Sequence, residues 1–154
     1  MASIANKPLP PGASTELSEV AKWVHTSDAR FAVMGNAKFC TNHEKLLSKT
    51  AKLLDIFLPE LPKAPLERAV IVICFDEPTP VPIDAGWVAY FMPVQEVQGV
   101  TIDDHTLYSN HYVQLDHNVT VSGKFYGLAF LFRFEPRNRL ERMSNFLKRA
   151  LKKG

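Results

Sequence analysis

The chain lacks the features that mark several large classes of protein. Its 154 residues include only two cysteines, Cys40 and Cys74, too few for a disulfide framework and, alone, for a zinc site. No apolar run approaches the roughly 20 residues of a bilayer-spanning helix, and residues 1–11 lack the apolar centre of a secretion signal. We therefore expect a soluble, cytoplasmic protein that does not associate with membranes.

Signatures of catalysis and of cofactor binding are also missing. The sequence contains no glycine-rich phosphate loop, no Gly-x-Ser-x-Gly segment and no His-Glu-x-x-His segment. We expect no cofactor and no bound metal. The composition itself, 46% hydrophobic and 22% charged, is typical of an ordinary globular domain with a real core.

Charge is unevenly distributed along the chain. The net charge is +2, yet residues 133–154 hold eight basic and two acidic side chains, which leaves a net charge of −4 on residues 1–132. Such asymmetry indicates either an anionic partner or complementarity within the chain.

The first 13 residues contain three prolines and a glycine and little to bury, which predicts a flexible N-terminal arm. A single domain spanning residues 14–154 follows. Apolar residues at helical spacing predict an N-terminal helix over about 15–26, and residues 29–39 are a weak strand candidate.

A broad apolar stripe over residues 42–58 predicts the longest helix of the chain. Thr41 and Glu44 have the spacing of a capping box, in which the two residues satisfy each other's backbone amides at the helix start. Leu54 of this helix and Val72 of the following strand are each expected to be buried against the other's layer, helix on sheet.

Four strands are predicted after this helix. The β-branched run 69–75 suits a strand covered on both faces, and residues 119–134 read as one strand bent near Gly123 or Gly127. The loop at 76–82 has alternate prolines, which keep it out of the centre of a sheet. The other two predicted strands are 87–92 and 107–115.

The last segment has the pattern of an amphipathic C-terminal helix. Its apolar arc comprises Leu140, Met143, Phe146, Leu147, Ala150 and Leu151. Because strands and helices do not alternate, the order of elements disfavours a parallel sheet. We predict an α+β fold: a curved, mainly antiparallel sheet packed around the long central helix, with helices near both ends.

His111 is the strongest candidate for chemistry. Strand parity places it with Leu107, Val113 and Leu115, so its imidazole is expected to point towards the core or a cavity. Its role is then structural, ligand-binding or catalytic, and as an acid/base it would use Asp103, Asp104 or Tyr126 as helpers. A one-residue slip in register would turn it outward.

Two other groups of residues have the composition of a metal or nucleophile site. His105, His111 and His117 resemble a metal cluster, but along a strand six residues span about 20 Å, which is too far for ligands of one ion. Cys40 and His43 lie near the start of the long helix, where a thiolate would be stabilised, although no group that orients His43 is evident.

Surface residues suggest how a partner would bind. The aromatic side chains Tyr108, Tyr112 and Trp87, together with Pro80 of the proline loop, are expected to line a binding surface. On the basic terminal helix, Arg142, Arg149 and Lys153 lie off the apolar arc and are candidates for contact with an anionic partner.

Three functional hypotheses remain open. The first is a non-enzymatic binding module that holds a small apolar ligand or a protein partner, and its sheet edges would permit a homodimer. The second is a small lyase, isomerase or thioesterase-like enzyme with His111 as acid/base in a pocket of the curved sheet. The third is a nucleic-acid-binding accessory protein that uses the terminal helix.

Overall fold

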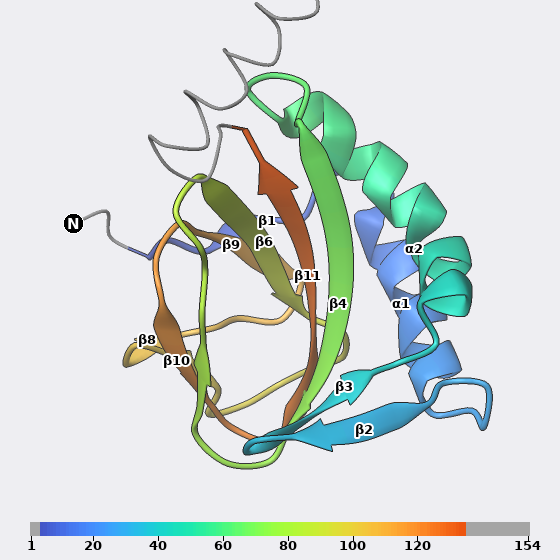
Figure 1. Cartoon of the computed structure of the whole chain (residues 1–154), viewed down its shortest axis with the longest axis vertical. Coiled ribbons are helices and arrows are strands. Elements are labelled where there is room, and N and C mark those ends of the chain that lie inside the picture. The colour runs from blue at the N-terminus through green and yellow to red at the C-terminus, as the bar shows by residue number, and fades with distance from the viewer. Residues whose placement is uncertain (1–3, 135–154) are drawn as a thin grey trace, which may run out of the picture.

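The computed structural model of the chain describes residues 4–134, which form three layers (Figure 1). Two helices, α1 (Ala13–Val24) and α2 (His43–Phe57), form one outer layer, and a 3-10 turn, η1 (Leu58–Glu60), follows α2. The strands are β1 (Lys7–Pro8), β2 (Phe31–Met34), β3 (Ala37–Cys40), β4 (Glu67–Phe75), β5 (Thr79–Val81), β6 (Trp87–Pro93), β7 (Thr101–Ile102), β8 (His105–Thr106), β9 (His111–Leu115), β10 (Val119–Ser122) and β11 (Phe125–Arg133).

The strands form two sheets, and every pairing among the described residues is antiparallel. The larger sheet has the order β1-β9-β6-β11-β4-β3-β2, and the smaller has the order β5-β10-β7-β8. The predicted α+β class and antiparallel pairing are thus confirmed. The single sheet curved around a central helix is not confirmed, because α2 lies beside α1 on one face and the small sheet covers the other (Figure 1).

Strand β11 is the centre of the larger sheet. It pairs with β4 along all nine of its residues and with β6 along seven. Its side chains alternate between two cores: Leu128, Phe130 and Phe132 pack towards the helices, whereas Phe125 and Ala129 pack towards the small sheet. Val72 and Ile73 divide in the same way in β4, which confirms the prediction of a strand covered on both faces.

The predicted bend in residues 119–134 is a change of sheet. The chain leaves the small sheet at Ser122, turns at Gly123 with a φ of +131°, and enters the larger sheet as β11. Gly127 stays inside β11, where a Cβ atom would lie 2.6 Å from Cζ of Phe91. Its missing side chain therefore makes room for the aromatic cluster that includes Phe75, whose ring stacks on Phe125 at 4.9 Å.

The weak strand candidate at 29–39 is a hairpin. Strands β2 and β3 pair from Phe31 opposite Cys40 to Met34 opposite Ala37, and Gly35 takes a φ of +63° in the two-residue turn. Positive φ at the first turn residue is typical of a type II′ hairpin. Strand β2 is the outer strand of the larger sheet.

The capping box at the start of α2 is wrong. The N-cap residue is Asn42, and no side chain caps the helix. The Thr41 hydroxyl instead donates to the Arg30 carbonyl at 3.3 Å, and the Asn42 side-chain oxygen accepts from the Arg30 amide at 3.0 Å. These polar groups bind the start of α2 to the segment that enters β2, because tertiary contacts compete with local caps for the same hydrogen bonds.

Other boundaries differ in smaller ways. The predicted helices at 15–26 and 42–58 are present, shifted by at most two residues. Strand 107–115 begins only at His111, because Asn110 has a φ of +60° and breaks the extended conformation. Part of the predicted arm, Lys7–Pro8, pairs with β9. The predicted C-terminal helix lies outside the described residues.

Two leucines of α2 allow a test of the packing between this helix and the larger sheet. Leu53 is 0% exposed in the core between α2 and the larger sheet, whereas Leu47 of the same helix is 54% exposed. Replacement of Leu53 by alanine is expected to lower the free energy of unfolding by about 2–4 kcal/mol, because it removes buried area and leaves a cavity. Leu47→Ala is the control and is expected to change it by less than about 0.5 kcal/mol. Urea unfolding of both variants measures this, and equal losses would contradict the packing.

Candidate functional site

His111 is the first residue of β9 and is half-buried. It shares strand parity with Val113 and Leu115, which are buried between the two sheets. The imidazole Nδ1 lies 2.8 Å from the Ser109 carbonyl, to which a protonated Nδ1 donates, and the ring contacts Tyr108 edge-on at 6.1 Å. It keeps the strand parity of Val113 and Leu115, and its observed partners belong to the loop that precedes its own strand.

Tyr108 and Tyr112 do not form one exposed surface. Tyr108 is 56% exposed, but Tyr112 is only 7% exposed. The ring of Tyr112 stacks on that of Tyr90, with centroids 5.6 Å apart, and contacts that of Phe57 edge-on, with centroids 5.2 Å apart. The prediction of an exposed Tyr112 is therefore wrong. The reason is that β9 is covered on both faces, so the parity opposite to His111 points towards the helices and not to solvent. Burial first, and the nearby Glu60 carboxylate second, raise the pKa of Tyr112.

Asp103 and Asp104 form the tight turn between β7 and β8. Their φ values of +48° and +67° are tolerated well by aspartate. Asp103 accepts a hydrogen bond from the Thr120 amide at 2.7 Å, and its other carboxylate oxygen lies 3.9 Å from Nε2 of His117. His117 is also 2.9 Å from the Asp116 carboxylate. Within residues 4–134, no three His, Cys, Asp or Glu side chains converge as metal ligands.

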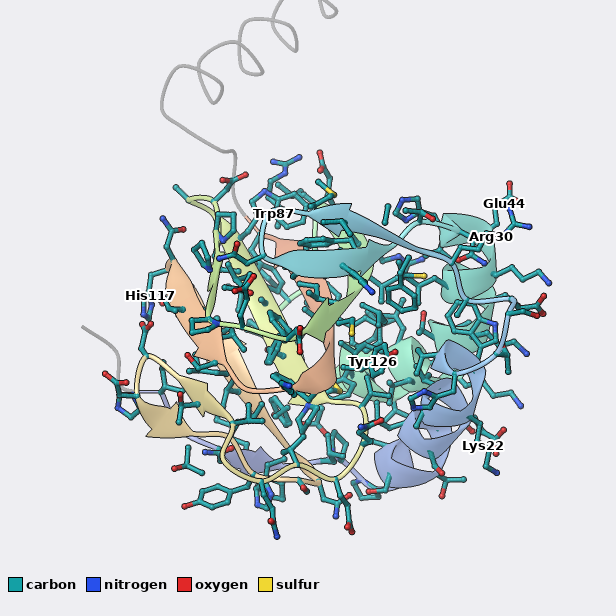
Figure 2. The ribbon with its side chains drawn as sticks, turned by 90° about the horizontal axis from the view of Figure 1, so that it is seen from below. Lys22, Arg30, Glu44, Trp87, His117 and Tyr126 are labelled. Carbon is teal, nitrogen blue, oxygen red and sulfur yellow. The ribbon has the colours of Figure 1, made fainter. Side chains whose placement is uncertain are left out.

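Tyr126 lies far from this turn. It is the second residue of β11 and faces the helix layer, where its ring centroid lies 5.1 Å from that of His25 and 5.6 Å from that of Phe31. Figure 2 shows Tyr126 near α1 and the β2–β3 hairpin, with His117 on another side of the molecule. His111 is two strands away in the order β9-β6-β11 and faces the opposite side of the sheet. Across the described residues, no hydrogen bond or ion pair joins His111 to Asp103, Asp104 or Tyr126.

A groove of about 510 Å³ lies next to Tyr126, where the helices do not cover the sheet. Its floor is a row of register partners on four adjacent strands: Val33 opposite Lys38, Lys38 opposite Cys74, and Cys74 opposite Tyr126. Gln95 and Lys124 also line the groove. The row has no local signal in the sequence, because its members come from distant segments, and Tyr126 is its one residue among the predicted site residues.

The chemistry of the groove is that of a binding surface with apolar and polar parts. Burial first, and the neighbouring Cys74 thiol second, raise the pKa of Tyr126, so its hydroxyl stays protonated at neutral pH and can donate a hydrogen bond. At the rim, the Lys124 ammonium lies 3.7 Å from the Asp76 carboxylate in an exposed ion pair. Such a pair contributes little to stability and is available for exchange with a partner.

Strand β2 forms one side of this groove and is exposed. Val33 is 69% exposed and Met34 is 61% exposed. The Thr41 amide donates to the Arg30 carbonyl at 2.8 Å. This bond makes Arg30 and Thr41 a hydrogen-bonded pair, which determines which residues of β2 bond to β3 and which do not. Because hydrogen-bonded pairs alternate in an antiparallel hairpin, Ala32 and Met34 bond to β3, whereas Phe31 and Val33 direct their N–H and C=O groups away from it.

The remaining predicted binding residues lie elsewhere. Trp87 is half-buried opposite Arg133 in the larger sheet, and Pro80 is exposed on β5 opposite Thr120. Because β5 is an edge strand, Pro80 is at the sheet edge, as the prolines predicted. Arg142, Arg149 and Lys153 lie outside the described residues.

Cys40, next to the start of α2, lacks the environment of a reactive thiolate. Cys40 is buried, and its thiol donates to the Asn42 side-chain oxygen at 3.3 Å. Burial raises the pKa of the Cys40 thiol, which is opposite to the shift that a reactive thiolate needs. Both cysteines are free, and Cys74 is the more exposed of the two.

Comparison with known protein families, with curated proteins and with solved structures finds no match to this chain. Among the described residues, no helix is long and apolar enough to cross a bilayer. The candidate site therefore rests on its own geometry.

Thiol labelling tests the two cysteine environments. Because the pKa of Cys40 is raised and its side chain is buried, we expect a disulfide reagent at pH 8 to modify Cys74 at least about tenfold faster than Cys40. Because burial raises the pKa of Cys40 above that of an unfolded thiol, its contribution to the free energy of unfolding is fully present below the unfolded pKa. This contribution is lost as the pH rises through the pKa of the folded protein. Reaction of Cys40→Ala and Cys74→Ala variants, followed by absorbance, assigns the two rates. Faster modification of Cys40 would contradict this account.

Proposed function

We propose that this chain is a non-enzymatic protein-binding module that takes an extended segment of its partner as an added strand along β2. The observation that carries the proposal is the outer edge of β2, where Phe31 and Val33 direct backbone groups away from β3. Outside the β2–β3 ladder, neither residue makes a backbone hydrogen bond within residues 4–134. Recognition by strand addition uses main-chain bonds of this kind for affinity.

The composition of β2 supports this choice of edge. Proteins commonly protect exposed edges with lysine or proline. At the opposite edge of the larger sheet, β1 consists of Lys7 and Pro8, and in the small sheet the outer strand β5 contains Pro80. Strand β2 has the sequence Phe-Ala-Val-Met, with neither a charge nor a proline. Its exposed Val33 and Met34 would lose contact with water when a partner strand pairs.

The groove supplies a source of specificity. A strand paired with β2 directs alternate side chains to the face that carries Phe31 and Val33. This face continues into the row formed by Lys38, Cys74 and Tyr126. A partner segment with apolar alternate residues and one acidic or hydrogen-bonding side chain would match both the floor and the Lys38 ammonium.

The other hypotheses gain less support. A small apolar ligand inside the curved sheet would need space between the two sheets, but Phe75, Phe91 and Phe125 pack there against one another. The acid/base residues proposed for an enzyme lie on different faces and turns. Nucleic-acid binding through Arg142, Arg149 and Lys153 stays a prediction.

Selection from a displayed library of random ten-residue peptides tests the proposal. The affinity of a selected peptide is then measured for the parent chain and for Val33→Pro. Proline removes an outward N–H and leaves the bonds of Ala32 and Met34 to β3 in place, so we expect at least about fivefold weaker binding. Val33→Thr, which keeps the N–H and the branched shape, is the matched control and should bind within about threefold of the parent.

Urea unfolding of the variants confirms that each is folded before affinities are compared. Failure to select any peptide, or equal binding to the parent and to a folded Val33→Pro variant, would overturn the proposed strand addition at β2.

A further inference from the structure

We infer that a second copy of this chain is one of the strands that β2 accepts, so that two copies pair edge to edge around a twofold axis at Ala32. The inference rests on the proposed function, because it uses the same edge. The two larger sheets would then join into one continuous antiparallel sheet. The argument depends on the phase of the backbone groups and on the charges along this edge.

The phase of β2 limits the positions of a twofold axis. In an antiparallel pair, the residues that exchange hydrogen bonds must both direct their backbone groups towards the partner. On β2 these residues are Phe31 and Val33. An axis at Ala32 places Phe31 of each copy opposite Val33 of the other, so both pairs exchange bonds and four hydrogen bonds form.

Other axes satisfy fewer groups. An axis at Phe31 pairs Phe31 with itself and places Val33 opposite Ala29, which lies in the turn before β2. An axis at Val33 pairs Val33 with itself and places Phe31 opposite Gly35, which lies in the hairpin turn. With either alternative axis, only the self-paired residue of β2 exchanges hydrogen bonds with its copy, which gives two bonds between the strands and not four. The axis at Ala32 is the one that also overlaps the whole extended segment 30–34.

The charges along the edge are compatible with self-pairing. With the axis at Ala32, Arg30 of one copy lies opposite Met34 of the other, and Asp28 lies opposite Asn36. No like charges face each other across the pair, whereas like charges placed directly opposite each other would destabilise it. Arg30 and Asp28 also make contacts within their own chain, to Asn42 and to Lys45.

The edge is short, and this sets the strength of the pairing. Five paired residues per copy bury less area than a stable, permanent dimer needs, so we expect a dimer that dissociates on dilution. Pairing also covers Val33 and Met34, the most exposed large apolar side chains of β2.

Engineered cysteines test the position of the axis. Ala32→Cys, made in the full chain with Cys74→Ala, places two thiols opposite each other at a non-hydrogen-bonded pair with Cα atoms about 4.5 Å apart, within disulfide range. Phe31→Cys and Val33→Cys in the same background are matched controls. Under the axis at Ala32, either pair is offset by two residues, about 7 Å along the strands, and is out of range.

We expect air oxidation of the Ala32→Cys protein to give a disulfide dimer on a non-reducing gel at least about tenfold faster than either control. Adding Val33→Pro should slow the cross-link by at least about tenfold, because each copy loses one bonding N–H, whereas Val33→Thr should not. Sedimentation of the parent chain from about 1 µM to about 1 mM is expected to show a monomer–dimer equilibrium.

The outcomes separate this inference from the proposed function. A parent chain that stays monomeric throughout, with no preference for the Ala32→Cys cross-link, overturns self-pairing, while selected peptides that still require Val33 leave strand addition standing. Faster cross-linking of Phe31→Cys or Val33→Cys overturns the axis at Ala32. Loss of both peptide binding and cross-linking overturns the two proposals together.

Discussion

The burial of β11 on both faces is the constraint on which the rest of the structure depends. A strand with partners on both sides and side chains alternating between two cores needs a cover on each face. Helices α1 and α2 provide one cover, and the small sheet provides the other. Gly127 shows how closely the second cover fits, because a Cβ atom there would meet two phenylalanine rings at 3.0 Å or less. The space between the two sheets is thus filled by side chains, and the groove beside Tyr126 lies outside it.

The open edge at β2 follows from the same arrangement. The chain turns from β3 into α2 at Asn42, whose side chain binds Asp28 and Arg30 in the segment before β2. The hairpin is therefore attached firmly at its base, while its outer strand extends past the two helices along the lower edge of the molecule in Figure 1. A base held by hydrogen bonds and an exposed, uncharged outer strand suit strand addition, because an edge that is already extended loses little conformational entropy on pairing.

The sequence predicted the long, strongly patterned elements best. The apolar stripe of residues 42–58 and the β-branched run 69–75 identify α2 and β4, because their periodicities reflect burial directly. The prediction of an exposed Tyr112 was wrong because it assumed that one face of its strand lies in solvent, whereas both faces are covered. The predicted capping box was wrong because the Thr41 hydroxyl donates to the Arg30 carbonyl, which is remote in the sequence. The row from Val33 to Tyr126 could not be predicted, since register between strands so far apart in the sequence has no local signal.

Amide hydrogen exchange at β2 tests the central claim most directly. The Val33 amide points away from β3, whereas the Ala32 amide bonds to it. In dilute protein, we expect Val33 to exchange at least about tenfold faster than Ala32, and to slow by at least about tenfold when a selected peptide saturates the edge. Equal protection of the two amides in dilute protein, or no change at Val33 on saturation, would contradict the account.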